Sequence, residues 1–271
     1  MKYKSIYLGT STIAFDLICK HSDFNIQSVI CEGKRITPAY ANIAKIHGIE
    51  LLSFVNKEEL VIILDSVLDK TDLFIIYQFD YIIPKQFSSS DKFYNFHSGS
   101  LSTNRGAHPI IRSILNGDTK TELTLHRINE QIDQGMVVGT FEVSIDQTDD
   151  AISLKAKTEK GLQSLLDKLM LFLKGDVDAN EINGGKYYKP ISEEDYTINL
   201  HLDSEIQISN KIRSQKQYKG AVFVFNGKKY YIKNIEHLDD LLNDENTIDF
   251  KDHFFVIKRL DTSFKLIIKE D

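Results

Sequence analysis

The segment DLFIIYQ, residues 72–78, is an apolar run with no alternation of apolar and polar residues. A strand of this kind is buried on both faces, as strands are in parallel sheets covered by helices. Similar runs precede it at 5–9 (SIYLG), 26–32 (IQSVICE) and 48–54 (GIELLSF), and a helical pattern follows each of them. Repeated strand–helix units predict an α/β fold with a Rossmann-like, doubly wound and mostly parallel sheet as its core.

The helical patterns between these strands have recognisable ends. Pro38 suits the first turn of a helix over 38–47, and Gly48 suits its C-terminal stop. Further on, apolar residues recur at helical spacing over 151–174, which predicts one long amphipathic helix there.

The character of the chain changes towards the C-terminus. Asn226-Gly227, between the apolar runs GAVFVF and KKYYIKNI, predicts a hairpin turn, and two further strand patterns follow. We therefore expect a core domain over residues 1–202 and a small β-rich C-terminal domain over residues 203–271.

Composition limits the classes of partner. The 271 residues carry a formal net charge of −6, whereas a nucleic-acid-binding protein normally presents net positive charge. The start MKYKSIYLGTS lacks the apolar region of a signal peptide, and no run of about 18 apolar residues predicts a membrane span. Cys19 and Cys31 lie in apolar runs, as reduced core thiols do. We expect a cytoplasmic protein that binds neither nucleic acid nor membrane.

Several common site motifs do not occur in this sequence. The first strand ends in GTS rather than GxGxxG, and neither GxxxxGKS nor GxSxG is found. The eight histidines include no HExxH pair, so no metal site is expected.

Polar side chains gather where another apolar strand ends, in YNFHSGSLSTNRGAHP, residues 94–109. Asn95 and His97 share one face of an extended strand, and ligands of open α/β sheets bind at the carboxyl ends of strands. A neutral imidazole can accept a proton, and a carboxamide N–H can stabilise an oxyanion. Asp133, in NEQIDQGM, is the candidate to orient the histidine or relay a proton. Spacing alone leaves open the alternative of an Asn-His turn and an unrelated surface aspartate.

This region resembles the formyltransferases that use N10-formyltetrahydrofolate. That family carries Asn-x-His, Arg-Gly, Pro, Asn-Gly, Thr-x-His and Asp-x-Gly in this order. The corresponding residues here are Asn95-Phe96-His97, Arg105-Gly106, Pro109, Asn116-Gly117, Thr124-Leu125-His126 and Asp133-Gln134-Gly135. The resemblance is specific over about residues 72–140 and looser from residue 1 to about 200. It departs at Leu101-Ser102, where the family has Leu-Pro, and this predicts a different loop path.

The resemblance implies an N-formyltransferase whose co-substrate is N10-formyltetrahydrofolate. His97 would accept the proton of the attacking amine and, with Asn95, stabilise the oxyanion. Asp133 would hold His97 or relay a proton towards the departing N10. His126 is expected to be structural. A non-catalytic folate- or sugar-binding protein is the alternative from a different functional class.

The resemblance also implies where the folate binds. FDYIIP, residues 79–84, is similar to the folate-binding loop of the family, and the loop before Asp133 is expected to form the other wall of the pterin slot. Backbone groups would provide most of the recognition. The residues expected in the slot are Tyr81, Ile83, Asn129 and Glu130.

Three branches of the family compete for the acceptor. Methionyl-tRNA formyltransferases carry a longer, basic C-terminal domain, and glycinamide ribonucleotide transformylases are shorter. Nucleotide-sugar N-formyltransferases join the core to small β-rich C-terminal parts and form dimers, which fits the length and charge here best. We expect a homodimer acting on a nucleoside-diphosphate amino-dideoxy sugar, with dTDP as the expected nucleotide, for surface polysaccharide such as the lipopolysaccharide O-antigen.

The expected acceptor contacts come from three residues. Arg105 would bind the diphosphate, Tyr218 would stack on the base and Ser11 would touch the sugar. Methionyl-tRNA remains the alternative acceptor, and the position of the sugar amine, at C3 or C4, is left open.

Overall fold

The computed structural model describes residues 2–182, 184–238, 246–259 and 262–269. The chain divides into two compact units, each assembled from segments far apart in the sequence. Unit 1 consists of Met1–Gly106, Glu122–Val143 and Lys157–Tyr187. Unit 2 consists of Ala107–Thr121, Ser144–Ala156 and Tyr188–Asp271. The expected boundary between residues 202 and 203 stays a prediction.

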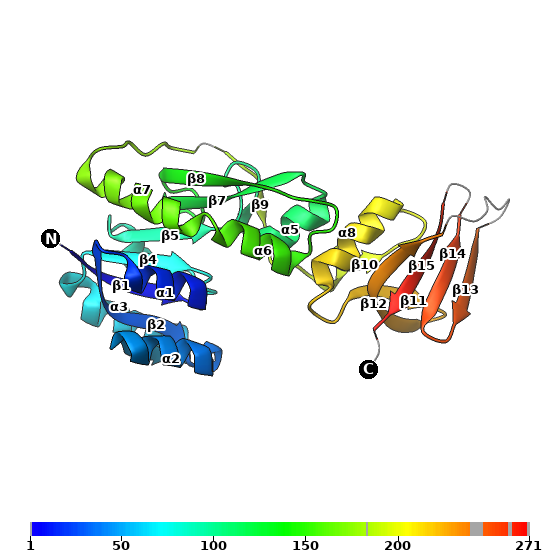
Figure 1. Ribbon diagram of the computed structural model, residues 1–271, viewed down its shortest axis with the longest axis horizontal. Coiled ribbons are helices and arrows are strands. Elements are labelled where there is room, and N and C mark those ends of the chain that lie inside the picture. Colours follow the sequence, from blue (N-terminus) through cyan, green and yellow to red (C-terminus); the bar gives the residue numbers. More distant parts are fainter. Residues whose placement is uncertain (1, 183, 239–245, 260–261, 270–271) are drawn as a thin grey trace. The chain divides into compact units, whose positions relative to one another are not determined.

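The main sheet has the strand order β3-β2-β1-β4-β5-β7-β8 (Figure 1). Strands β1 to β5 pair in parallel, and β7 is antiparallel to β5. The expected Rossmann-like, mostly parallel sheet is confirmed. Its strands are β1 (Tyr3–Gly9), β2 (Phe24–Glu32), β3 (Glu50–Phe54), β4 (Leu73–Tyr77), β5 (Phe93–His97), β7 (Lys120–Arg127) and β8 (Val137–Ser144).

The apolar runs are explained by two separate cores, one on each face of this sheet. Tyr7 of β1 and Ile75 of β4 belong to one buried cluster. Their neighbours Ile6, Leu8 and Phe74 belong to the other. Because successive side chains of a strand point to opposite faces, a strand with a core on each side needs apolar residues throughout.

The helix ends follow the sequence signals. In α2 (Pro38–His47), Pro38 lies in the first turn and Gly48 ends the helix in the left-handed conformation, with φ of 64°. The other helices are α1 (Thr12–Lys20), α3 (Lys57–Val67), α4 (Lys85–Ser88), α5 (Pro109–Asn116), α6 (Ala151–Glu159), α7 (Leu162–Lys174) and α8 (Glu205–Gln215).

The prediction of a single long helix over 151–174 is wrong. The helix is interrupted between Glu159, the last residue of α6, and Leu162, the first residue of α7. Gly161 is the N-cap residue of α7 and lies against the ring of Phe141 on β8. A Cβ at Gly161 would lie 2.4 Å from Phe141 Cγ, closer than real contacts allow. Apolar periodicity continues across the break, so the sequence pattern alone does not reveal it.

Unit 2 contains a second sheet, of strand order β10-β11-β12-β15-β14-β13. The predicted hairpin turn is confirmed, since Asn226 and Gly227 both have positive φ, at 49° and 74°. A short two-stranded pairing joins β6 and β9. The bounds of these two strands and of those in the second sheet are β6 (Arg105–Gly106), β9 (Tyr187–Tyr188), β10 (Thr197–Ile198), β11 (Ala221–Phe225), β12 (Lys228–His237), β13 (Thr247–Lys251), β14 (Phe254–Lys258) and β15 (Ser263–Ile268).

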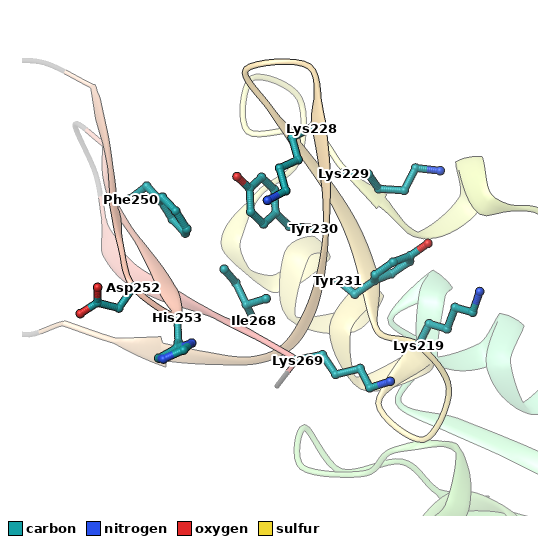
Figure 2. A pocket seen from close by; sticks show the side chains of 10 residues that line it. All are labelled: Lys219, Lys228, Lys229, Tyr230, Tyr231, Phe250, Asp252, His253, Ile268 and Lys269. Carbon is teal, nitrogen blue, oxygen red and sulfur yellow. The ribbon is translucent and has the colours of Figure 1, made fainter. Parts of the chain in front are cut away.

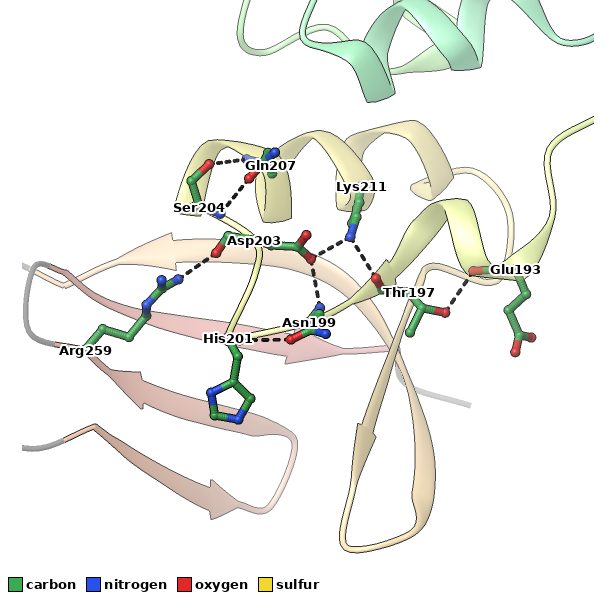
Figure 3. Close-up of polar contacts among 9 residues, drawn as sticks. All are labelled: Glu193, Thr197, Asn199, His201, Asp203, Ser204, Gln207, Lys211 and Arg259. Atoms are coloured by element: carbon green, nitrogen blue, oxygen red, sulfur yellow. Dashed lines mark hydrogen bonds and ion pairs between the residues drawn. The ribbon is translucent and has the colours of Figure 1, made fainter. Parts of the chain in front are cut away.

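A polar network holds the start of α8 in unit 2 (Figure 3). Asp203 is buried, and its Oδ2 accepts hydrogen bonds from Lys211 Nζ at 2.5 Å and from the backbone N–H of Asn199 at 2.8 Å. Ser204 caps the helix in a reciprocal capping box with Gln207. These contacts satisfy the buried carboxylate and fix the first turn of α8.

Two further observations concern membrane-spanning helices and the two cysteines. Among the helices that the structure describes, none is long and apolar enough to cross a membrane. Cys19 and Cys31 are both free thiols, and burial raises the pKa of Cys31 to about 11.

The contact at the α6–α7 break gives a stability prediction. Gly161→Ala should lower the free energy of unfolding by about 1–3 kcal/mol, because the new methyl group overlaps the Phe141 ring. Denaturant unfolding of the single variants and of Gly161→Ala with Phe141→Ala measures this as a double-mutant cycle. The penalty should be clearly smaller when the ring is absent, although the remaining Cβ of residue 141 would still lie 2.7 Å from the new methyl group. A penalty of equal size without the ring would contradict the explanation.

Candidate active site

The pairing of β5 with β7 brings the polar motifs together on one face. Asn95 lies opposite His126, and His97 lies opposite Thr124. Side chains directly opposite each other in an antiparallel pair lie close together. Thr124 Oγ1 donates a hydrogen bond to the carbonyl of Gly99 at 2.9 Å, which holds the chain just beyond the strand. The register therefore explains why Asn-x-His and Thr-x-His have the same spacing.

The imidazole of His97 is oriented by the backbone of the following loop. Its side chain is 6% exposed, and Nε2 lies 2.8 Å from the carbonyl oxygen of Asn104. Because a carbonyl can only accept a hydrogen bond, Nε2 carries the hydrogen. In the neutral ring, the lone pair is then on Nδ1.

Asp133 lies between two histidines. Its Oδ2 is 3.7 Å from His97 Nδ1, and its Oδ1 is 3.7 Å from His126 Nε2. The backbone N–H of Gly106 donates to Oδ2 at 2.8 Å and fixes the carboxylate. Asp133 has a positive φ of 52°. Residues other than glycine rarely adopt this conformation, and those that do are concentrated at functional sites. The structure thus brings together the three predicted catalytic residues.

His126, which the sequence predicts to be structural, joins the same cluster. Nδ2 of Asn95 lies 3.1 Å from His126 Nε2, and because an amide nitrogen only donates, Nε2 is the acceptor. Burial lowers the pKa of His126 to about 4, with His97 adding to the effect and the carboxylate of Asp133 opposing it. His126 is therefore neutral at physiological pH. Its alternate-residue spacing from Thr124, matching that of Asn95 and His97, was the available sequence signal.

The loop that departs from the family pattern forms a tight turn. The N–H groups of Thr103 and Asn104 both donate to the carbonyl of Ser100, at 3.2 and 2.7 Å. Leu101 is fully buried, whereas Ser102 is exposed. The residue that replaces the expected proline therefore lies on the outside of the turn.

The first predicted pterin loop follows β4. Ile83 is buried, and the hydroxyl of Tyr81 donates to Glu32 Oε1 at 2.7 Å. Among the residues that the structure describes, no backbone N–H or C=O of Tyr81 or Ile83 has a hydrogen-bond partner. These backbone groups are therefore available to a ligand.

The second predicted pterin loop connects β7 to β8. The side chain of Asn129 spans this loop, donating to the carbonyl of Gln134 at 3.0 Å. Glu130 Oε2 lies 3.8 Å from Nζ of Lys85, which begins the helix after Ile83. The two predicted pterin loops therefore lie side by side.

The three predicted acceptor residues have different surroundings. Ser11 is buried as the N-cap residue of α1, and its hydroxyl donates to Glu159 Oε1 at 3.1 Å. Arg105 is 8% exposed, and its Nη2 donates to the carbonyl of Gly185 at 2.7 Å. Its buried Nε and Nη1 have no hydrogen-bond partner among the described residues. Tyr218 is exposed and belongs to unit 2.

A separate open hollow of about 810 Å³ lies within unit 2 (Figure 2). Lysines and aromatic rings dominate its lining. Nζ of Lys228 is 5.2 Å from the ring centre of Tyr230, and Nζ of Lys219 is 5.9 Å from that of Tyr231. Over the described parts of the chain, no group of three or more His, Cys, Asp or Glu side chains is placed to hold a metal ion.

Comparison with protein families agrees with this geometry. Residues 20–168 match the formyl transferase family, and residues 190–266 match the formyl transferase C-terminal domain. The chain belongs to the formyl transferase family. It is accordingly an N-formyltransferase, and the cluster around His97 lies within the matched N-terminal region.

Eight curated relatives at the sequence level share one name. Methionyl-tRNA formyltransferase of Fusobacterium nucleatum is 30% identical over 243 residues, which cover 83% of this chain and 76% of that protein. Seven further curated relatives, at 24–37% identity, have the same name.

Solved structures similar to this formyltransferase include two other formyltransferases. An N-formyltransferase from Helicobacter canadensis, solved with folinic acid and dTDP-3-aminofucose, gives a TM-score of 0.75 at 18% identity and covers 99% of this chain and 100% of that one. WlaRD, a sugar 3N-formyl transferase solved with dTDP and 5-N-formyl-THF, gives 0.74 at 19% identity, covering 100% and 99%. At such identities the similarity establishes the shared fold.

The burial of His126 predicts how stability depends on pH. An unfolded histidine takes up a proton near pH 6.5, whereas folded His126 does so near pH 4. Between these values the unfolded state binds more protons, so stability falls as pH decreases, by up to about 3 kcal/mol. Urea unfolding at pH 7 and pH 4.5 measures this loss. It should be smaller in His126→Gln, which keeps an acceptor for Asn95, and equal losses in both proteins would contradict the assignment.

Proposed function

We propose that this formyltransferase transfers the formyl group of N10-formyltetrahydrofolate to the amine of a nucleoside-diphosphate amino-dideoxy sugar, with dTDP as the expected nucleotide. The observation that carries the transfer chemistry is the cluster of Asn95, His97, His126 and Asp133 at the carboxyl end of β5, in which both histidines are buried. The expected domain boundary, the homodimer, the cytoplasmic location and the role in surface polysaccharide belong to the same proposal.

The hydrogen-bond pattern supports one atom of His97 as the proton acceptor. Nε2 is committed to the carbonyl of Asn104, so Nδ1 takes the proton of the attacking amine. The carboxylate of Asp133 lies 3.7 Å from Nδ1 and stabilises the imidazolium that forms. Asp133 can then take this proton from Nδ1 and pass it on to N10 as it departs, which leaves both residues in their starting protonation states. A carboxylate fixed by the N–H of Gly106 needs no rearrangement for this task.

Asn95 supplies the donor for the developing oxyanion. Its Nδ2 has two hydrogens, and one of them is directed to Nε2 of His126. The second is available to the formyl oxygen, whose negative charge grows during the transfer. A neutral His126 is required for this orientation, since a protonated Nε2 would repel the amide N–H.

The two loops beside the cluster fit the folate. The unpaired backbone groups of Tyr81 and Ile83 offer donors and acceptors to a pterin edge. The neighbouring loop of Asn129 and Glu130 also carries Asp133, so a folate held by these two loops would lie near this carboxylate. N10-formyltetrahydrofolate supplies the one-carbon unit, and the protein supplies its orientation.

Arg105 supports an anionic group on the acceptor. A buried guanidinium without a carboxylate partner is costly unless an anion binds to it. Nε and Nη1 of Arg105 are such donors, within the described residues, and a diphosphate accepts hydrogen bonds of this kind. Ser11 and Tyr218 stay proposed contacts to the sugar and the base.

Methionyl-tRNA is the second candidate acceptor, and two observations favour it. The curated relatives carry that name, and the hollow of unit 2 concentrates lysines beside aromatic rings, a surface that suits nucleic acid. Against it, residues 203–271 hold twelve Lys and Arg against twelve Asp and Glu, and the whole chain is acidic. The balance of charge favours the nucleotide sugar.

The role of His97 gives the first activity test. His97→Ala should lower the rate of formyl transfer at least about a hundredfold, the size expected for loss of a general base. Single-turnover assays with N10-formyltetrahydrofolate and a dTDP-amino sugar measure the rate, and His201→Ala, on an exposed residue of unit 2, is the matched control. If wild type and His97→Ala are equally inactive on every amine tested, the enzymatic proposal fails.

The lysines of the unit 2 hollow separate the two acceptors. The double variant Lys228→Glu with Lys269→Glu should keep the rate of formyl transfer to a dTDP-amino sugar within about twofold of wild type. These two side chains would contribute only to binding a polyanion such as tRNA. The double variant Lys57→Glu with Lys70→Glu, on exposed residues of unit 1, makes the same change in net charge and is the control. Formylation of methionyl-tRNA by wild type at a comparable rate, lost in the double variant and steeply salt-dependent, would overturn the sugar assignment.

A further inference from the structure

One short backbone segment anchors both members of the His97–Asp133 pair. The carbonyl of Asn104 accepts from His97 Nε2 at 2.8 Å, and the N–H of Gly106 donates to Asp133 Oδ2 at 2.8 Å. The distance between imidazole and carboxylate therefore depends on where residues 104–106 lie. A displacement of this segment moves the two groups relative to each other.

Residues 104–106 are in turn held by a segment distant in sequence. The N–H of Arg105 donates to the carbonyl of Lys186 at 2.9 Å, and Nη2 of Arg105 donates to the carbonyl of Gly185 at 2.7 Å. All of these residues belong to unit 1. The segment that contains Gly184 and Gly185 is therefore in direct contact with the backbone that positions His97 and Asp133.

The two glycines have the same conformation but different surroundings. Both have a φ of 92°, which side-chain-bearing residues rarely adopt. A Cβ at Gly185 would lie 2.3 Å from the carbonyl oxygen of Leu101 and 3.2 Å from Arg105 Nε, whereas a Cβ at Gly184 meets nothing within 4 Å. Of the two glycines, therefore, only Gly185 must lack a side chain for its backbone to pack against the turn that follows His97.

We propose that Gly185 is a positioning residue for formyl transfer: its missing side chain lets residues 184–186 pack on the Leu101–Arg105 turn, and this packing sets the spacing of His97 and Asp133. The catalytic meaning of this spacing rests on the proposed function, but the spacing itself does not. At 3.7 Å the two groups are slightly too far apart for a direct hydrogen bond, so a small shift changes how well Asp133 stabilises charge on Nδ1.

The test compares Gly185→Ala with Gly184→Ala, because both place alanine at the same positive φ and only the first adds a backbone clash. Long-range ¹H–¹⁵N spectra of the imidazole nitrogens, taken without substrates, report which nitrogen of His97 carries the hydrogen. The His97 signals are assigned by their loss in His97→Gln. Turnover of formyl transfer is measured in parallel for wild type and both variants.

The expected result is a selective effect of Gly185→Ala. The His97 signals should change from the Nε2–H form to a mixture, and kcat should fall about tenfold or more, while Gly184→Ala keeps wild-type signals and stays within about twofold in kcat. Equal effects of both variants would show that the backbone strain common to both is the cause, and this would contradict the proposal. Wild-type His97 signals in a folded Gly185→Ala would also overturn the proposal.

Two further outcomes are distinguished. If Gly185→Ala does not fold, as judged by far-ultraviolet circular dichroism, the same spectra are recorded for Arg105→Met, which releases the carbonyl of Gly185 without adding a methyl group there. Unchanged His97 signals in that variant contradict the proposal. If the signals respond as expected but wild type transfers no formyl group, the proposed function fails and the positioning role stands.

Discussion

The hydrogen bond from His97 Nε2 to the carbonyl of Asn104 is the interaction on which the rest of the site depends. It fixes the tautomer of the imidazole and leaves Nδ1 as the atom that can accept a proton. It also ties the ring to the same loop that holds Asp133 through the N–H of Gly106. One short segment of backbone therefore determines both the chemistry of the histidine and the position of its carboxylate partner.

The second half of the site is organised by burial. His126 lies within the protein and stays neutral, because burial disfavours its charged form. A neutral ring accepts a hydrogen bond from Asn95 and fixes the orientation of its amide, whereas Asp133, partly exposed, faces both histidines. The two imidazoles thus have separate tasks, set by which backbone or side-chain group each nitrogen contacts.

Much of this arrangement could be predicted from the sequence, since it depends on local rules. Alternation along a strand placed Asn95 and His97 on one face, and unbroken apolar runs indicated a sheet buried on both sides. The position of His126 beside Asn95, by contrast, follows from the register of β5 with β7, which is a long-range property. The break at Gly161 depends on a ring from another strand, and Gly184 and Gly185 differ only in their three-dimensional neighbours.

The acceptor is the point at which fold, charge and relatives give different indications. A structure of the protein with a dTDP-amino sugar and a non-transferable folate would test the central claim most directly, by the distance from the sugar amine to His97 Nδ1 and Asp133. The account predicts an amine nitrogen within about 3.2 Å of one of these groups, as general-base catalysis requires. An amine far from both, with the nucleotide seated on the lysines of the unit 2 hollow, would contradict it.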